Sequence, residues 1–119
     1  MRADIKNTND GTLNEAELKE LSARMLPQDD VEIISEFFKA LSDPTRISIV
    51  DALQQHEWLC GSELAQLLGI TKSAVSHQLC NMRLNKLVRV KRDGKRVYYA
   101  LNDDHVAKVF AMAVTHIHE

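Results

Sequence analysis

The chain has 119 residues and a formal net charge of −2 at pH 7. This length fits one domain with a modest core. No apolar run approaches the roughly 18 residues that a membrane-spanning helix needs, and the N-terminus does not resemble a signal peptide, so we expect a soluble, cytoplasmic protein without a membrane partner. Glycine-rich phosphate loops and hydrolase nucleophile motifs are absent from the sequence, which argues against an enzyme acting on a small organic substrate.

Charge is distributed unevenly along the chain. Residues 1–43 hold five Lys or Arg residues against ten Asp or Glu residues, whereas residues 72–99 hold eight basic residues against Asp93 alone. A basic surface on an otherwise acidic protein is the typical footprint of nucleic-acid binding. The alternative is a run of solvated charges without a partner.

The first 43 residues predict an arm followed by two helices. Residues 1–12 are polar and aperiodic, and we expect a flexible arm there, with a single domain over residues 13–119. A short amphipathic helix that Pro27 ends is marked by Leu13, Leu18, Leu21 and Met25. Asp29 or Asp30 is expected to cap the next helix. Its core positions follow the spacing i, i+3, i+4, i+7 and are Ile34, Phe37, Phe38 and Leu41.

A third helix is predicted to start where Asp43 and Pro44 stand next to one another. Asp43 suits the N-cap and Pro44 the first helical position. Apolar residues that line this helix are Ile47, Val50 and Leu53, and it is expected to end near His56.

Residues 61–84 predict two short amphipathic helices joined by a tight turn, which is typical of a helix-turn-helix. The apolar positions are Leu64, Leu67 and Leu68 in the first helix and Val75, Leu79 and Met82 in the second. Gly69 suits a left-handed helix end, Ile70 the corner, and Thr71 the next N-cap. The opposite face of the second helix carries Ser73, Ser76, His77 and Cys80. Small polar residues there permit close approach to a DNA major groove, although any helical hairpin has a wet polar face.

Residues 87–101 predict a β-hairpin after the second helix. Asp93 and Gly94 between β-branched and aromatic runs are a strong two-residue turn signal. A turn at these two residues pairs Arg92 with Lys95, Val90 with Val97, and Val88 with Tyr99. One face is then formed by Val88, Val90, Val97 and Tyr99, and packs on the helices. The other is formed by Arg89, Lys91, Arg96 and Tyr98.

Four cations crowd the tip of this hairpin: Lys91, Arg92, Lys95 and Arg96. Because they repel one another, an anionic partner such as DNA phosphate explains them. The predicted fold is therefore mainly α with a small β-hairpin (α+β), a winged helix-turn-helix. Its expected DNA contacts are Lys72, Ser73, Ser76, His77, Lys91, Arg92, Lys95 and Arg96.

Three sequence segments identify a family resemblance. The run LSDPTRISIVDAL, the segment SAVSHQL and the hairpin RDGKRVYYAL closely resemble the ArsR/SmtB family of metal-sensing winged-helix repressors. The resemblance covers roughly residues 31–119. It implies a homodimer, formed through N- and C-terminal helices, that binds double-stranded operator DNA when metal-free and releases it when metal binds.

The last predicted helix, residues 103–118, carries a possible metal site. The pattern of Asp103, His105, His116 and Glu119 is similar to the zinc site of the zinc-sensing members. The two histidines lie within about 20° of one helix face but about 16 Å apart along its axis, so they cannot share a metal within one chain. An antiparallel twofold dimer can join two ligands from each subunit. Two imidazoles and two carboxylates suit Zn²⁺, with Co²⁺ or Cd²⁺ possible.

Adjacent alternatives to these ligands remain open. Asp104 and His118 stand beside the expected ligands, and Asp103 could act only as a helix N-cap. The apolar part of the dimer seam is expected to comprise Leu101, Val106, Val109, Phe110, Met112, Ala113 and Ile117.

The two cysteines are twenty residues apart and do not form a disulfide framework. Cys60 is interpreted as a small buried residue and Cys80 lies near the presumed DNA face. The competing hypothesis is a winged-helix regulator that senses thiol oxidation at one of these residues.

Overall fold

The computed structural model describes residues 11–119, so the predicted N-terminal arm lies almost wholly outside the described residues. Two compact units divide the chain, Met1–Ser35 and Glu36–Glu119. The prediction of one domain from residue 13 onward stays a prediction. Within the described residues, no helix is long and apolar enough to cross a membrane.

Helix α1 (Glu15–Arg24) begins with reciprocal capping hydrogen bonds. The Glu17 N–H donates to Asn14 Oδ1 over 2.8 Å, and the Asn14 N–H donates to Glu17 Oε1 over 2.9 Å. Backbone N–H groups at the start of a helix lack partners within the helix. Here the N–H groups of Asn14 and Glu17 each gain a side-chain acceptor through the cap.

Helix α2 (Gln28–Leu41) starts two or three residues earlier than a cap at Asp29 or Asp30 would allow. The Pro27 carbonyl already accepts from the Val31 N–H at 3.1 Å. Asp29 and Asp30 therefore lie in the first turn rather than at the N-cap. Their carboxylates still suit the positive end of the helix dipole.

Several apolar residues expected in the core are exposed in the single chain. On α2, Leu41 is buried and Phe37 is half-buried, but Ile34 and Phe38 are 42% and 51% exposed. On α1, for which an amphipathic helix but no core position was predicted, Leu18 and Leu21 are exposed as well. Helical periodicity identified an apolar face correctly, but it does not tell whether the covering surface belongs to the same chain.

Helix α3 (Pro44–Gln55) begins as predicted, with Asp43 as N-cap, Pro44 in the first turn, and His56 as C-cap. Its buried residues are Ile49, Val50 and Leu53, whereas Ile47 is 39% exposed. Val50 and Leu53 are therefore core residues as predicted, whereas Ile49 is buried in place of Ile47.

Helices α4 (Gly61–Leu68) and α5 (Lys72–Leu84) form the predicted helix-turn-helix. Gly69 has a φ of 68°, the left-handed conformation that favours glycine, and Thr71 caps α5 through the Ala74 N–H at 3.0 Å. The inner face of α5 is confirmed by the burial of Val75, Leu79 and Met82. Leu67 was expected in the core but is 64% exposed.

Three antiparallel strands, β1 (Leu59–Cys60), β2 (Val88–Asp93) and β3 (Arg96–Leu101), form one sheet in the order β1-β3-β2. The two-residue strand β1 escaped prediction because it is too short to show any alternation.

The predicted hairpin register is wrong by two residues. Arg92 pairs with Val97, and Asp93 pairs with Arg96. The turn is therefore Gly94 and Lys95, and only Gly94, with a φ of 64°, takes a positive value. A turn at Asp93 and Gly94 would instead place both residues at positive φ. A shift of two preserves the alternation, so the predicted faces hold.

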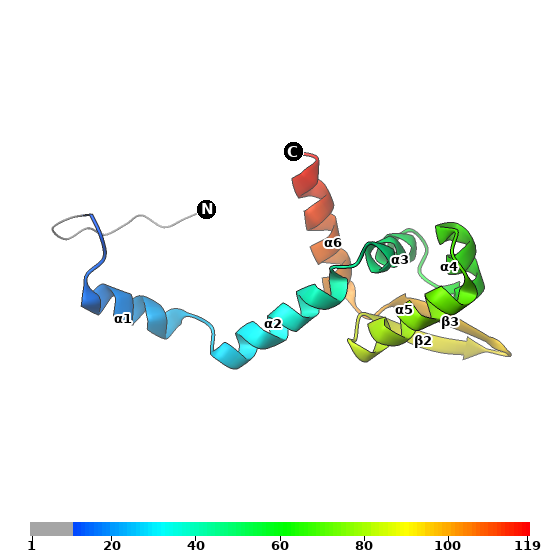
Figure 1. The fold of residues 1–119 in the computed structure, drawn as a ribbon, viewed down its shortest axis with the longest axis horizontal. Helices are drawn as coiled ribbons and strands as arrows, with labels where there is room; N and C mark the ends of the chain where they lie inside the picture. The colour runs from blue at the N-terminus through cyan, green and yellow to red at the C-terminus, as the bar shows by residue number, and fades with distance from the viewer. Residues whose placement is uncertain (1–10) are drawn as a thin grey trace. The chain divides into compact units, whose positions relative to one another are not determined.

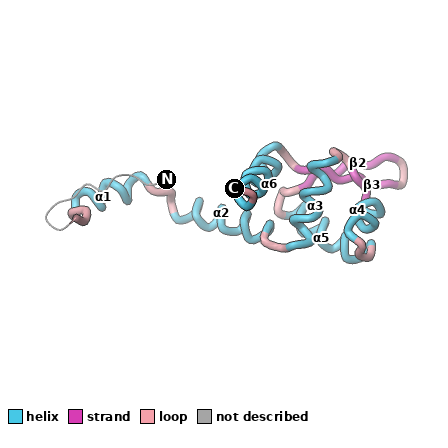
Figure 2. Tube along the Cα trace, turned by 90° about the horizontal axis from the view of Figure 1, so that it is seen from above, coloured by secondary structure: helices cyan, strands magenta, loops and turns pink. Residues whose placement is uncertain are grey.

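Figures 1 and 2 show the β2–β3 hairpin projecting beyond the helices at the end of the second unit where α4 lies. Helix α6 (Asp104–Ile117) stands at the other end of the same unit. The core between them joins residues of all four helices α3 to α6 and the sheet. Val106 belongs to this core at 2% exposed, so it does not serve the expected dimer seam.

We predict that Leu79→Ala lowers the free energy of unfolding by roughly 2–5 kcal/mol, because it leaves a cavity in the core beneath α5. Leu67→Ala removes the same atoms from an exposed site and should change the free energy of unfolding by only about 0.5 kcal/mol. Urea unfolding monitored by circular dichroism measures both values, and equal losses would contradict the placement of the core.

Candidate nucleic-acid interface and metal centre

The outer face of α5 is polar and open to solvent. Ser73, Ser76, His77 and Cys80 are all exposed, opposite the buried residues of the same helix. The inner face fixes the helix in the domain, and the outer face carries short side chains that leave room for base edges. The structure thus presents these residues as predicted.

A cleft of about 340 Å³ separates the start of α5 from the hairpin tip. Lys72 and Ser76 line it from α5, Lys95 and Arg96 from the hairpin, and Ser62 from the start of α4. Four of the residues predicted to contact DNA are therefore brought together here, with donors on opposite walls. This arrangement fits an anion held by several donors at once.

The cations of this cleft have no ion-pair partners within the described residues. None of Lys72, Lys95 and Arg96 forms an ion pair within residues 11–119. Arg96 Nη1 lies 3.8 Å from Cys60 Sγ. The hydrogen bond from the Cys60 N–H chiefly lowers the pKa of Glu63, and Arg96 adds to the effect through its charge. Glu63 is thus held at the start of α4, where it caps the helix.

The environment of Lys91 was not predictable from the periodicity of the sequence. Lys91 Nζ lies 4.4 Å from the centroid of the Trp58 ring, and the guanidinium carbon of Arg89 lies 4.7 Å from the same centroid. Arg89 also pairs with Glu57 at 3.3 Å. In the free chain, Lys91 is therefore engaged by cation–π attraction. Trp58 directly precedes β1, and no periodicity in the sequence connects it with Arg89 and Lys91 of β2.

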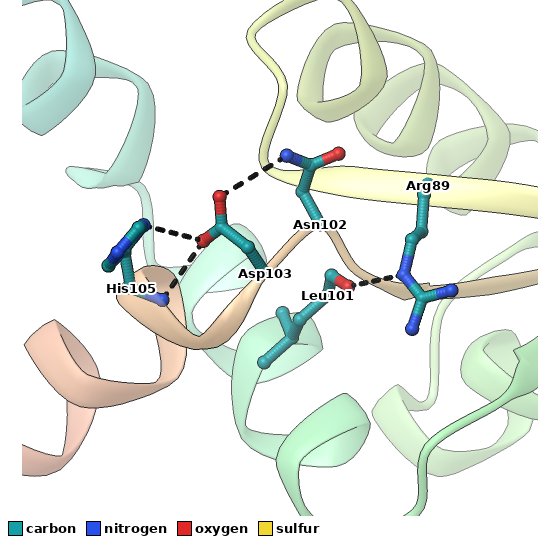
Figure 3. Close-up of polar contacts among 5 residues, drawn as sticks. All are labelled: Arg89, Leu101, Asn102, Asp103 and His105. Carbon is teal, nitrogen blue, oxygen red and sulfur yellow. Dashed lines mark hydrogen bonds and ion pairs between the residues drawn. The ribbon is translucent and has the colours of Figure 1, made fainter.

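The first pair of predicted metal ligands lies at the start of α6 (Figure 3). Asp103 Oδ1 accepts from the His105 N–H at 2.9 Å and lies 3.4 Å from His105 Nδ1. Asp103 is therefore the N-cap that sequence analysis left open. Desolvation opposes ionisation, but the pKa of Asp103 is lowered because the hydrogen bond from His105 and the positive field of its imidazole outweigh it.

The second pair lies at the other end of the helix. His116 Nδ1 is 3.8 Å from Glu119 Oε1. His118 is the C-cap, and Asp104 is the first helical residue. Both histidine side chains are more than four-fifths exposed, at 84% for His105 and 81% for His116.

Each end of α6 thus presents one imidazole with one carboxylate, and the ends are separated by about 16 Å of helix. Residues 11–119 of one chain contain no group of three or more metal-ligating side chains. The donors of the two ends together, two nitrogen and two oxygen ligands, form a set that suits Zn²⁺.

Neither cysteine joins this set. Both thiols are free, and Cys60 is 4% exposed, as predicted, while Cys80 is exposed on α5.

A polar-faced recognition helix beside a cationic hairpin defines a winged-helix DNA-binding protein, not an enzyme. The model of the arsR family of bacterial regulatory proteins matches residues 43–90. The chain belongs to this family.

Similar proteins support this assignment over a longer span. A transcriptional repressor SmtB homolog of Synechocystis is 36% identical over 87% of this chain and 77% of its own. A cadmium resistance regulatory protein CadC homolog of Staphylococcus aureus is 33% identical over 72% of this chain and 71% of its own. The crystal structure of NolR from Sinorhizobium fredii matches with a TM-score of 0.68 and 32% identity, over 78% of this chain and 96% of that one.

We predict that Arg96→Ala weakens binding to all duplex sequences and lowers the slope of log K against log salt by about 1, because one phosphate contact is lost. Fluorescence anisotropy at several salt concentrations measures the slope. Lys39→Ala, which removes an exposed cation of α2 that is not among the predicted DNA contacts, is the control. An effect on sequence preference alone, with an intact slope, would contradict the assignment.

His77→Ala is expected to act differently, since a base contact discriminates between sequences. Each good base contact contributes about 1–3 kcal/mol of discrimination. Binding to a panel of duplexes with single substitutions should show flattened preference with an unchanged salt slope. A uniform loss across the panel would instead make His77 a backbone contact.

Proposed function

We propose that the protein is a metal-responsive transcriptional repressor, with zinc as the metal. The metal-free homodimer binds an inverted-repeat operator and releases it when metal binds to the C-terminal helices. The observation that carries the proposal is the pair of half-sites at opposite ends of α6: Asp103 with His105, and His116 with Glu119.

Two half-sites on one helix require a second copy to complete them. In an antiparallel twofold arrangement, the start of one α6 faces the end of the other. Asp103 and His105 of one subunit then meet His116 and Glu119 of the other, twice per dimer. The relatives' names support a metal as the signal, since the CadC homolog is named for cadmium resistance. Co²⁺ and Cd²⁺ fit the same donors, so affinity and availability select among them.

Exposed apolar residues supply a surface for this dimer. On α6, Met112 and Ile117 are 73% and 71% exposed, and on α1 Leu18 is 51% exposed. Such residues favour burial against a partner. We therefore propose that α1 and α6 form the dimer interface, with Val106 excluded because it is buried in its own subunit.

A chain of backbone hydrogen bonds joins the metal half-site to the recognition helix. The Asn102 N–H, next to Asp103, donates to the Leu87 carbonyl at 2.9 Å, and the Leu87 N–H donates to the Met82 carbonyl of α5 at 2.8 Å. We propose that the free ring N–H of metal-bound His116 also donates to a carbonyl among residues 85–87 of the other subunit, whose α6 start it faces in the antiparallel dimer, since metal-bound imidazoles are usually fixed in this way. Metal binding that fixes α6 would then also shift residues 85–87 and, through them, the end of α5.

The operator is expected to have half-sites about one helical turn apart, roughly 34–36 Å between centres, because twofold symmetry sets their spacing. Selection of binding sites from a randomised duplex pool reveals this spacing. Full-affinity binding of a monomer to one half-site would contradict the dimeric model.

We predict that zinc lowers DNA affinity without dissociating the dimer, and that His116→Gln abolishes this response while metal-free binding stays near wild type. The reason is linkage: a ligand shifts an equilibrium only through its different affinity for the two states. Zinc titration of the operator complex under reducing conditions, with metal counted per dimer, measures the response. Acidification should weaken it, because imidazole must be neutral to bind metal.

Cys60→Ser is the variant that tests the thiol hypothesis, and its zinc response should equal that of wild type. If His116→Gln still released DNA at the same zinc concentration while Cys60→Ser did not, the metal site would be misplaced and the thiol would be the sensor.

A further inference from the structure

Arg46 joins three helices of the second unit. Its Nε donates to Gln78 Oε1 of α5 at 2.7 Å, and its Nη1 donates to the Ala40 carbonyl of α2 at 3.0 Å. Its own N–H donates to Asp43 Oδ2 at 3.1 Å, which anchors it in the first turn of α3. The side chain is half-buried, so water competes less for these bonds than at an exposed site.

The Ala40 carbonyl needs this partner. Ala40 lies in the last turn of α2 and is 5% exposed. Its intrahelical partner would be the N–H four residues on, but that residue is Pro44, which has none. A buried carbonyl without a donor is unfavourable, so Arg46 is tied to this point of α2.

The hydrogen bond from Arg46 Nε fixes the orientation of the Gln78 side-chain amide. Arginine only donates hydrogen bonds, so the carbonyl oxygen of Gln78 must face Arg46 and its NH₂ group must face away. Gln78 is half-buried on the flank of α5 and directly follows the exposed residue His77. Any rotation of α5 that moves His77 therefore stretches the bond between Arg46 and Gln78.

We propose that Arg46 is a positioning residue for sequence recognition: through Gln78 it fixes the rotation of α5 about its own axis. The buried apolar side chains of α5 hold the helix against the core, but apolar burial is non-directional. The 2.7 Å hydrogen bond is directional and sits on the flank, where it opposes rotation. The proposal rests on DNA binding by α5 and is independent of the metal site.

The test uses metal-free protein with chelator and two duplexes: one selected from a randomised pool by wild type, and one of unrelated sequence. The measured quantity is the ratio of the two affinities. Arg46→Lys and Gln78→Met should each lower this ratio by about fivefold, the size of one lost hydrogen bond. Affinity for the unrelated duplex, and its salt slope, should stay unchanged.

Three further variants separate positioning from folding. The double variant Arg46→Lys with Gln78→Met should lower the affinity ratio no more than either single variant does, because each substitution breaks the same hydrogen bond between Arg46 and Gln78. Gln78→Glu keeps an acceptor for Arg46 and should retain the ratio, although its charge weakens binding to both duplexes equally. Gln54→Met, at an exposed position of α3, is the matched control and should change nothing.

Several results would overturn the proposal. The first is an unchanged ratio in Gln78→Met, or losses that add in the double variant. The second is a loss of preference at one base pair only, seen in Gln78→Met but not in Arg46→Lys. That result would mean that Gln78 contacts a base directly. If Arg46→Lys melts before it can be measured, the Gln78 variants alone decide. Because this test uses metal-free protein, a lost or retained zinc response in His116→Gln concerns the metal site alone, and failure of wild type to bind either duplex would contradict DNA binding itself.

Discussion

The burial of one face of α5 is the constraint on which the interface depends. Val75, Leu79 and Met82 are each at most 1% exposed, and burial of such side chains contributes roughly 1.5–3 kcal/mol each, as an upper estimate. Because this face is buried, the opposite face of α5 is exposed to solvent and is free to contact DNA. Because Gly69 and Thr71 fix where α5 starts, the core also decides which residues point outward.

The charges of the hairpin follow two separate arrangements. Lys95 and Arg96 face the cleft beside α5 without an ion pair in the described part of the chain, whereas Lys91 and Arg89 lie against Trp58. A cation over an aromatic ring still carries its charge, so Lys91 adds to the field around the hairpin. The Trp58 ring occupies one side of the Lys91 ammonium group, so fewer of its three N–H groups are open to a phosphate. Lys95 and Arg96 are therefore the better prepared candidates for phosphate contact.

Local signals predicted those parts of the fold that local chemistry decides. The caps at Asp43 and Thr71 and the left-handed Gly69 depend on neighbouring residues only, and all three were correct. The hairpin register was missed because a turn can use Gly94 at either central position, and only the strand pairing separates the two choices.

Long-range contacts explain the remaining differences. The link from Arg46 to Gln78 joins residues 32 positions apart, and no periodicity reports it. The exposure of Phe38 was missed for the related reason that an apolar stripe is the same whether its own chain or a partner covers it. For the predicted metal ligands, helical rise separates the two pairs by about 16 Å, and residues 11–119 of one chain hold no group of three or more such side chains. That these residues bind metal stays a prediction.

The twofold symmetry of the proposed dimer has an energetic consequence for switching. Coupling between a metal site and a DNA site is typically about 1–3 kcal/mol, whereas moving an equilibrium from 1:99 to 99:1 needs about 5.5 kcal/mol. One site therefore falls short of a complete switch. Two equivalent sites that act on the same pair of recognition helices double the coupling to about 2–6 kcal/mol, which reaches the required range at its upper end. Splitting each site between the subunits has a second effect, because one metal ion then constrains both copies of α6. In the proposed dimer, the half-sites at the two ends of α6 would thus let two weak couplings act on the same pair of helices.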